Sequence, residues 1–126
     1  MAVIGIGVDL TRIERFQRFL DRDRHAVIDR IFTAEEQGYS LGKRHAACHL
    51  AARFAAKEAF LKALGTGLRL GISWQDIAVV RDDLGCPSLH LSGRAAEILE
   101  QRGGKRTHLS YTHDGLYAVA TVVLED

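Results

Sequence analysis

The feature that most constrains the fold is an uninterrupted, alanine-rich segment from His45 to Leu64. Its composition predicts one long helix, and Gly65 is well placed to end that helix in the left-handed conformation. Phe54, Leu61 and Leu64 lie near one stripe of the segment, a spacing that is typical of an amphipathic helix. Other elements are therefore expected to pack against this helix.

The segment from Thr11 to Leu20 is also predicted to be helical, with a basic stripe. Ile13, Phe16 and Leu20 fall on one face, and arginines follow on the opposite face at steps of three and four residues. These arginines are Arg15, Arg18 and Arg22.

Shorter helices are predicted on either side of the long one. The segment "HAVIDRIF", residues 25–32, continues the helical pattern, and Thr33 with Glu36 forms a T-x-x-E capping box for a further helix. Ser92 can cap the helix in "GRAAEILEQRG", which Gly103 closes.

Strands are predicted where β-branched and apolar residues alternate. The first runs from Val3 to Leu10 and contains Gly5 and Gly7, which indicate close backbone neighbours. Asp-Gly at 114–115 separates the last two apolar runs and is a strong hairpin signal. Because no regular βαβ repeat is present, the sequence predicts an α+β fold with a mainly antiparallel sheet. The other predicted strands are residues 76–82, 87–92, 107–113 and 116–125.

Length and composition restrict the class of protein. The 126 residues are expected to form one domain, 1–126, and 47% of them are hydrophobic. The net charge of +1 argues against nonspecific coating of nucleic acid, although it leaves room for a local basic face. No apolar run approaches a membrane span, and "MAVIGIGVDL" lacks the charged start of a signal peptide, so a cytoplasmic location is expected. Cys48 and Cys86 belong to no CxxC pattern and suit reduced thiols.

Asp9 and Glu58 are candidate ligands for a divalent metal ion. Asp9 falls near the end of a glycine-bearing strand, and Glu58 falls inside the long helix. If the carboxylates came within ~4 Å, their repulsion would be about 4 kcal/mol at an effective dielectric constant of 20, so a proton or cation would have to intervene. Magnesium is commonly held by one or two carboxylates, with waters and substrate phosphates completing its shell. The alternative is a solvated surface ion pair between Glu58 and Lys62, worth about 0.2–0.5 kcal/mol.

Positive charges surround Glu58 along the sequence. Arg53, Lys57 and Lys62 lie on the same helix, and a basic cluster at residues 43–45 precedes it. Such residues can hold phosphate oxygens and offset the charge that develops in phosphoryl transfer.

Two further features give weaker signals. Gly65 and Gly67 in "GTG" would let a ligand approach the backbone closely, although a simple helix end is the stronger explanation of Gly65. His113 precedes the hairpin turn, where it could support the turn or donate a hydrogen bond in a phosphate site.

In order and spacing, five segments resemble the holo-acyl-carrier-protein synthases, the short phosphopantetheinyl transferases. They are "GVDL", "RIERF", "FTAEE", "RFAAKEAFLKALGTG" and "SYTHDGLYAVATVV", and the similarity covers nearly the whole chain. The resemblance implies transfer of 4'-phosphopantetheine from coenzyme A to a serine of apo acyl carrier protein, with release of adenosine 3',5'-bisphosphate. It also implies a magnesium requirement, a homotrimer with active sites at subunit interfaces, and the fold of the 4'-phosphopantetheinyl transferases.

The resemblance also implies roles for individual residues. Asp9 and Glu58 would hold the metal, Lys62 would lie beside the reacting phosphate, and Glu58 and Lys62 would be the catalytic residues. With Lys57 they would form one inward polar face, and the serine proton would pass to Glu58 or to a water on the metal. The residues expected near coenzyme A are Arg53, Lys57, Lys62, Gly65, Gly67 and His113. Those expected to receive the acidic carrier protein are Arg15, Arg22 and Arg24.

The chain departs from the resemblance at two positions. Cys86 stands where relatives commonly have a lysine in a "GKP" turn, which puts a cationic contact from that turn in doubt. His45 stands where some relatives have arginine, and Arg44 can substitute. A noncatalytic nucleotide- or RNA-binding module is the alternative function, and the near-zero net charge and few aromatic residues disfavour it.

Overall fold

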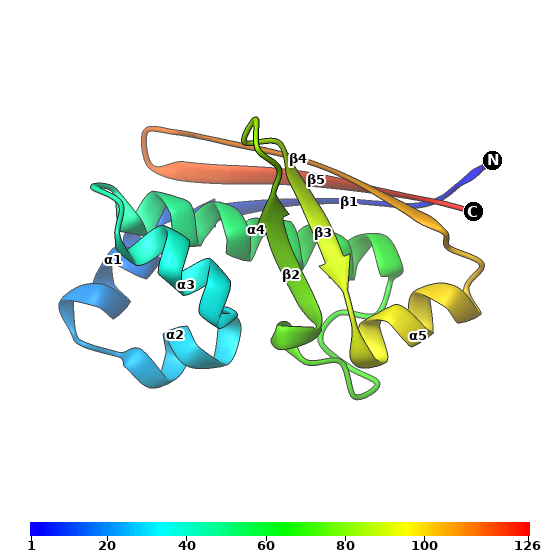
Figure 1. Cartoon of the computed structure of the whole chain (residues 1–126), viewed down its shortest axis with the longest axis horizontal. Coiled ribbons are helices and arrows are strands. Elements are labelled where there is room, and N and C mark those ends of the chain that lie inside the picture. Colours follow the sequence, from blue (N-terminus) through cyan, green and yellow to red (C-terminus); the bar gives the residue numbers. More distant parts are fainter.

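The computed structural model describes residues 1–126 and contains five α-helices, one short 3-10 helix and five strands (Figure 1). The strands are β1 (Val3–Arg12), β2 (Ile77–Arg81), β3 (Pro87–Leu91), β4 (Arg106–Asp114) and β5 (Tyr117–Glu125). The helices are α1 (Ile13–Asp21), α2 (His25–Ile31), α3 (Ala34–Leu41), α4 (Ala46–Leu64) and α5 (Gly93–Gln101), with the 3-10 helix η1 at Trp74–Asp76.

All strand pairs are antiparallel, and they form two sheets where the sequence pattern predicts one. The larger sheet has the order β1-β5-β4, and β2 pairs with β3 in a second sheet. Figure 1 shows the helices on one side of the three-stranded sheet, with α4 running along it and the β2–β3 hairpin crossing α4. The predicted α+β class with antiparallel pairing is confirmed.

The long helix α4 is the scaffold of the molecule. Of its 19 residues, 14 are buried, so the predicted amphipathic pattern is wrong and α4 is a core helix. Its alanines let neighbours approach from several sides. Gly5 and Gly7 bring β1 against it, because a Cβ at either position would overlap a carbonyl oxygen of Ala63 or Ala59. This close approach carries the end of β1 past the middle of α4.

Two apolar clusters meet at α4. The larger joins its C-terminal half to β5, β2 and α5, through residues such as Phe60, Val122 and Ile98. The smaller joins its N-terminal half to α1 and α2, and the rings of Phe16 and Phe54 lie 5.3 Å apart at its centre. Helices α1 and α2 therefore cover one end of α4, and the hairpin and α5 cover the other.

Several predicted local signals are confirmed. Thr33 Oγ1 accepts from the Glu36 N–H at 3.1 Å, and the Glu36 carboxylate accepts from the Thr33 N–H at 2.8 Å, as a capping box requires. Gly65 ends α4 with a φ of +82°. The hairpin at residues 114–115 joins β4 to β5.

One predicted helix start and one predicted cap are wrong. β1 continues through Thr11 and Arg12, because both residues pair with β5, and α1 begins only at Ile13. Ser92 precedes α5 as expected, but its side chain makes no capping hydrogen bond.

Candidate active site

Asp9 and Lys62 form an ion pair where β1 passes α4. Lys62 Nζ lies 3.0 Å from Asp9 Oδ1 and also donates to the Val8 carbonyl at 3.0 Å. Thr11, which the sequence pattern assigns to the following helix, is an additional member of the site: its hydroxyl donates to Asp9 Oδ2 at 2.6 Å. Thr11 is buried and the Asp9 side chain is only 13% exposed, so the carboxylate is held in one orientation.

Glu58 lies in the electrostatic reach of Asp9. Burial raises the pKa of the Glu58 carboxyl and the Asp9 charge raises it further, while Lys62 and Arg15 oppose the shift. The alternative ion pair between Glu58 and Lys62 does not form, because Lys62 turns to Asp9. We call Asp9, Glu58 and Lys62 the acidic site.

The acidic site fits a divalent cation that takes part of its shell from non-protein oxygens. Glu58 is half-buried and repelled by Asp9, and a cation between the two carboxylates would relieve that repulsion. No third His, Cys, Asp or Glu completes a metal-binding group here. Two carboxylates suit magnesium, which keeps waters or phosphates as ligands, better than zinc, which takes three or four protein ligands.

Lys57 points away from the acidic site, so the expected polar face shared with Glu58 and Lys62 is wrong. Its ammonium group is fully buried, pairs with Glu36 at 2.7 Å, and donates to two backbone carbonyls at 2.7 and 3.2 Å. Successive residues of a helix are about 100° apart, so Lys57 faces α3 and η1 while Glu58 faces β1. Its three donors are all used, and it has none left for coenzyme A.

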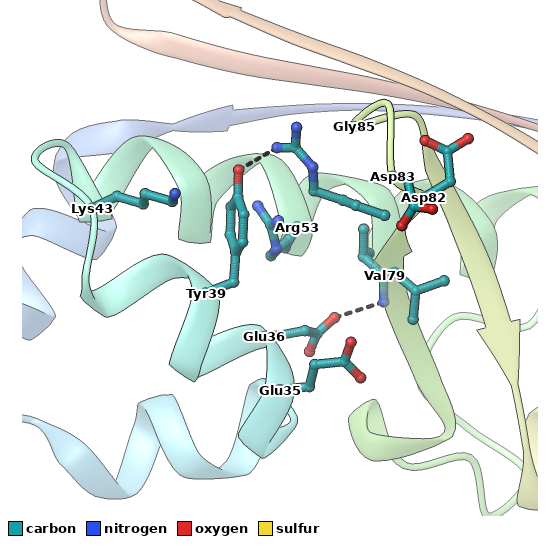
Figure 2. A pocket seen from close by; sticks show the side chains of 11 residues that line it. Glu35, Glu36, Tyr39, Lys43, Arg53, Val79, Asp82, Asp83 and Gly85 are labelled. Carbon is teal, nitrogen blue, oxygen red and sulfur yellow. Dashed lines mark hydrogen bonds between the residues drawn. The ribbon is translucent and has the colours of Figure 1, made fainter.

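A cavity of about 440 Å³ opens between α3, α4 and the β2–β3 hairpin (Figure 2). Most of its lining is polar or charged. Three cations line the cavity with Tyr39, and so do four acids, of which Glu36 is already paired with Lys57. The cations are Lys43, Arg53 and Arg81, and the other acids are Glu35, Asp82 and Asp83.

Tyr39 stands at the centre of three cations in this cavity. The charged groups of Lys43, Arg53 and Arg81 lie 4.6, 4.4 and 4.9 Å from the centroid of its ring. We call these three side chains the cation cluster. Arg53 is almost completely buried, and its Nε has no hydrogen-bond partner. A buried unpaired donor among several cations is suited to binding an anion.

The cation cluster includes residues that the sequence motifs do not mark. Arg81 donates to the Tyr39 hydroxyl across the cavity, although the two residues are 42 positions apart. Tyr39 follows a capping box and Arg81 ends a strand, and neither location indicates a ligand site.

His113 lies within electrostatic reach of His49, next to the cation cluster. Burial lowers the pKa of the His49 imidazole, and the charges of Arg53 and His113 are among those that lower it further. The His49 ring meets the Tyr39 ring edge-on at 5.5 Å. The residues expected near coenzyme A are divided between two faces of α4, with Arg53 beside Tyr39 and Lys62 beside Asp9.

Arg15, Arg22 and Arg24 are all exposed. Arg15 lies over an aromatic ring of α4 at 4.9 Å and acts on the Glu58 pKa, so it faces the acidic site. Arg22 and Arg24 flank the turn between α1 and α2. A basic surface thus extends from Glu58 to this turn.

Gly65 and Gly67 both have left-handed backbone, with φ values of +82° and +62°. Arg102 donates to the Leu64 carbonyl beside Gly65. The end of α4 therefore accounts for Gly65, whereas the space around Gly67 is open to a ligand.

Comparison with known proteins agrees with this fold. The chain matches the family model described as the 4'-phosphopantetheinyl transferase superfamily over residues 5–122. A holo-[acyl-carrier-protein] synthase of Syntrophotalea carbinolica is 59% identical over 121 residues, which are 96% of this chain and 94% of that protein. The crystal structure of the Neisseria meningitidis holo-[acyl-carrier-protein] synthase has a TM-score of 0.88 and 36% identity, covering 99% of this chain and 100% of that one.

A second solved structure contains a ligand. The Helicobacter pylori holo-[acyl-carrier-protein] synthase, in complex with coenzyme A, has a TM-score of 0.83 and 28% identity, covering 95% of this chain and 99% of that one. Since the family model and the relatives span nearly the whole chain, the chain belongs to the 4'-phosphopantetheinyl transferase superfamily.

Proposed function

We propose that the protein transfers 4'-phosphopantetheine from coenzyme A to a serine of an apo acyl carrier protein, giving the holo carrier and adenosine 3',5'-bisphosphate. The observation that carries this proposal is the acidic site itself, which Asp9, Glu58 and Lys62 form between β1 and α4. The names of the full-length relatives support the carrier as acceptor, and the coenzyme A complex supports the donor.

Asp9 and Glu58 would hold a magnesium ion in this reaction. When bound, the ion would supply positive charge that offsets the negative charge of the diphosphate and of the transition state. The hydroxyl of Thr11 orients Asp9 for this role by donating to one carboxylate oxygen.

In the reaction, the serine oxygen forms a bond to the phosphorus that carries pantetheine, and the bond from that phosphorus to adenosine 3',5'-bisphosphate breaks. The serine proton passes to Glu58, whose half-buried carboxylate lies beside Asp9. The Lys62 side chain is 53% exposed, so its ammonium can turn from Asp9 to donate to a phosphate oxygen.

The cavity at the cation cluster would bind an anionic part of coenzyme A. Its volume of about 440 Å³ is within the range of ligand pockets, and the three side chains of the cation cluster line it. Arg53 and His113 keep the roles that the resemblance implies, and Gly67 stays a candidate for close approach. Lys57 takes no part in ligand binding.

The basic surface of Arg15, Arg22 and Arg24 would receive the acidic carrier protein. Complementary charge would guide the carrier serine toward Glu58 and would act mainly on the rate of association.

A homotrimer is part of the proposal because one face of the larger sheet is apolar and uncovered. Four side chains of the edge strand β1 are between 40% and 68% exposed: Ile4, Ile6, Val8 and Leu10. Figure 1 shows that no helix covers this face of the sheet. An exposed apolar row on an edge strand indicates a contact with another chain. In such a trimer, His113 and Glu58 could serve one active site from different subunits.

A cytoplasmic location completes the proposal. Cys48 and Cys86 are both free thiols, as expected in a reducing compartment. None of the helices combines the length and the apolar character needed to cross a membrane.

The test is the intact mass of an apo acyl carrier protein incubated with the purified protein, coenzyme A and magnesium. The mass should rise by one phosphopantetheine group, and it should stay unchanged when coenzyme A is omitted. Binding of coenzyme A without any change in the carrier mass would instead favour a noncatalytic nucleotide-binding module.

A further inference from the structure

The C-terminal end of α2 is held by side chains from other elements. This helix has seven residues, and its N-terminal end has no side-chain cap. A helix this short is unstable by itself, and its last carbonyls need partners from outside the helix. Buried Ile28, Ile31 and Phe32 attach it to the core on one side only.

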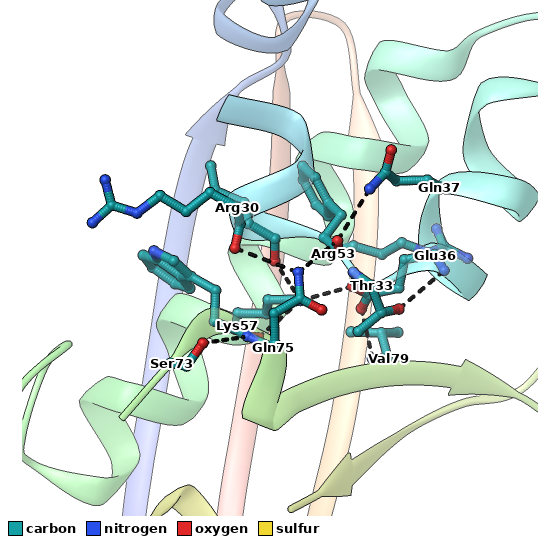
Figure 3. A network of polar contacts seen from close by, with 12 residues as sticks. Arg30, Thr33, Glu36, Gln37, Arg53, Lys57, Ser73, Gln75 and Val79 are labelled. Atoms are coloured by element: carbon teal, nitrogen blue, oxygen red, sulfur yellow. Dashed lines mark hydrogen bonds and ion pairs between the residues drawn. The ribbon is translucent and has the colours of Figure 1, made fainter. Parts of the chain in front are cut away.

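Gln75 of η1 supplies most of the missing partners (Figure 3). Its side-chain amide donates to the carbonyls of Asp29 at 2.9 Å and Phe32 at 2.8 Å, and the Arg30 carbonyl lies 3.5 Å away. One exposed side chain thus spans the last turn of α2. It connects this turn to η1, which is more than 40 residues away in the sequence.

Lys57 completes this cap and links it to α4. Its ammonium donates to the remaining carbonyl, that of Ile31, at 2.7 Å, and the same group is fixed by Glu36. Because Glu58 is the next residue of α4, the end of α2 is tied to the helix that carries the acidic site.

We propose that Gln75 is a positioning residue for carrier docking, an inference that rests on the proposed function. Arg22 directly follows α1 and Arg24 directly precedes α2, so the placement of α2 decides where these arginines lie relative to Glu58. Gln75 is exposed, so water can replace its hydrogen bonds and the fold persists without them. Its loss leaves α2 free to shift, while the cavity between α3, α4 and β2 keeps its walls.

The test is the variant Gln75→Met, which keeps the length of the side chain and removes both donors. The KM for an apo acyl carrier protein should rise about tenfold, which corresponds to about 1.4 kcal/mol. The KM for coenzyme A and the thermal midpoint should stay at the wild-type values. Amide hydrogen exchange over residues 28–32 should become faster, because these amides report the opening of α2.

Two matched variants serve as controls. Gln37→Met removes a single bond of 3.2 Å to the Phe32 carbonyl and should give a smaller effect in the same direction. Gln101→Met changes an exposed glutamine at the end of α5 and should have none.

The outcomes separate this inference from the function beneath it. Active Gln75→Met protein with an unchanged carrier KM, or with equal increases for carrier and coenzyme A, overturns the docking role alone. Wild-type protein that modifies no carrier overturns the proposed function and the docking role together.

Discussion

Lys57 and Glu58 are neighbours in α4, yet they occupy opposite environments. Lys57 is fully buried, and each of its donors has a partner in α2, α3 or η1. Glu58 is half-buried beside Asp9, a second negative charge. A buried network in which every polar group has a partner fixes the packing. An accessible charge that a like charge repels, and whose pKa is perturbed, is typical of a functional site. The comparison shows that adjacent charges in a sequence do not share a role when a helix turns them toward different neighbours.

The largest expected effect is the loss of stability when the buried Lys57 is replaced. In Lys57→Met, the Glu36 carboxylate is left buried without its cation, so the free energy of unfolding should fall by about 3–5 kcal/mol. Urea denaturation at pH 7 measures this. Lys62→Met is the matched control on the same helix: Lys62 is exposed, and its loss should cost less than about 1 kcal/mol. Lys57→Met protein that keeps wild-type stability but loses transfer would place Lys57 in the chemistry after all.

The next largest effect is on the transfer rate, when Asp9 of the acidic site is replaced. Asp9→Asn should lower the transfer rate at least about 100-fold, as expected when one preorganised electrostatic contact is lost. It should also lower the pKa of Glu58, because the Asp9 charge is one of the causes that raise it. Carboxyl NMR titration of the variant measures this pKa. A Glu58 pKa that does not move would mean that the two carboxylates are not coupled.

Charge reversal on the basic surface should have a smaller effect that is confined to the carrier. Arg15→Glu with Arg22→Glu should raise the KM for the carrier about tenfold, or about 1.4 kcal/mol, and leave the KM for coenzyme A nearly unchanged. Reversal of the exposed Arg69 provides the control. Similar increases for both substrates would remove the docking assignment.

The smallest effect concerns pH. Burial, Arg53 and His113 keep the pKa of His49 below its ordinary value, and an anion bound at the cation cluster should raise it. Binding of coenzyme A then takes up a proton, so its affinity should increase as the pH falls through the interval between the free and bound pKa values. Imidazole NMR titration with and without coenzyme A checks this. An unchanged His49 pKa would place the anion elsewhere.

The sequence predicts the parts of this molecule that depend on local signals. The capping box at Thr33, the left-handed end at Gly65 and the 114–115 hairpin are short-range features, and all three are confirmed. The expectation of close backbone neighbours at Gly5 and Gly7 agrees with the structure, because β1 packs against α4 there.

The direction in which charges point is not predictable in the same way. Alanines of α4 lie on nearly every side of the helix, so its hydrophobic pattern does not show which element packs against which face. The ion pair between Lys57 and Glu36 and the hydrogen bond from Arg81 to Tyr39 form only because distant segments pack together. Thr11 joins the acidic site because pairing with β5 extends β1 beyond the point where the helical pattern begins.

The most direct measurement is the single-turnover transfer rate of Glu58→Gln, taken together with its thermal midpoint. Ionised Glu58 disfavours the folded state, because its folded pKa is raised, and this cost is present above that pKa and is relieved as the pH falls through it. At neutral pH the variant should therefore keep or exceed the wild-type midpoint while its transfer rate falls at least about 100-fold. Transfer at the wild-type rate, or a loss of stability like that of Lys57→Met, would contradict the separation of roles on the two sides of α4.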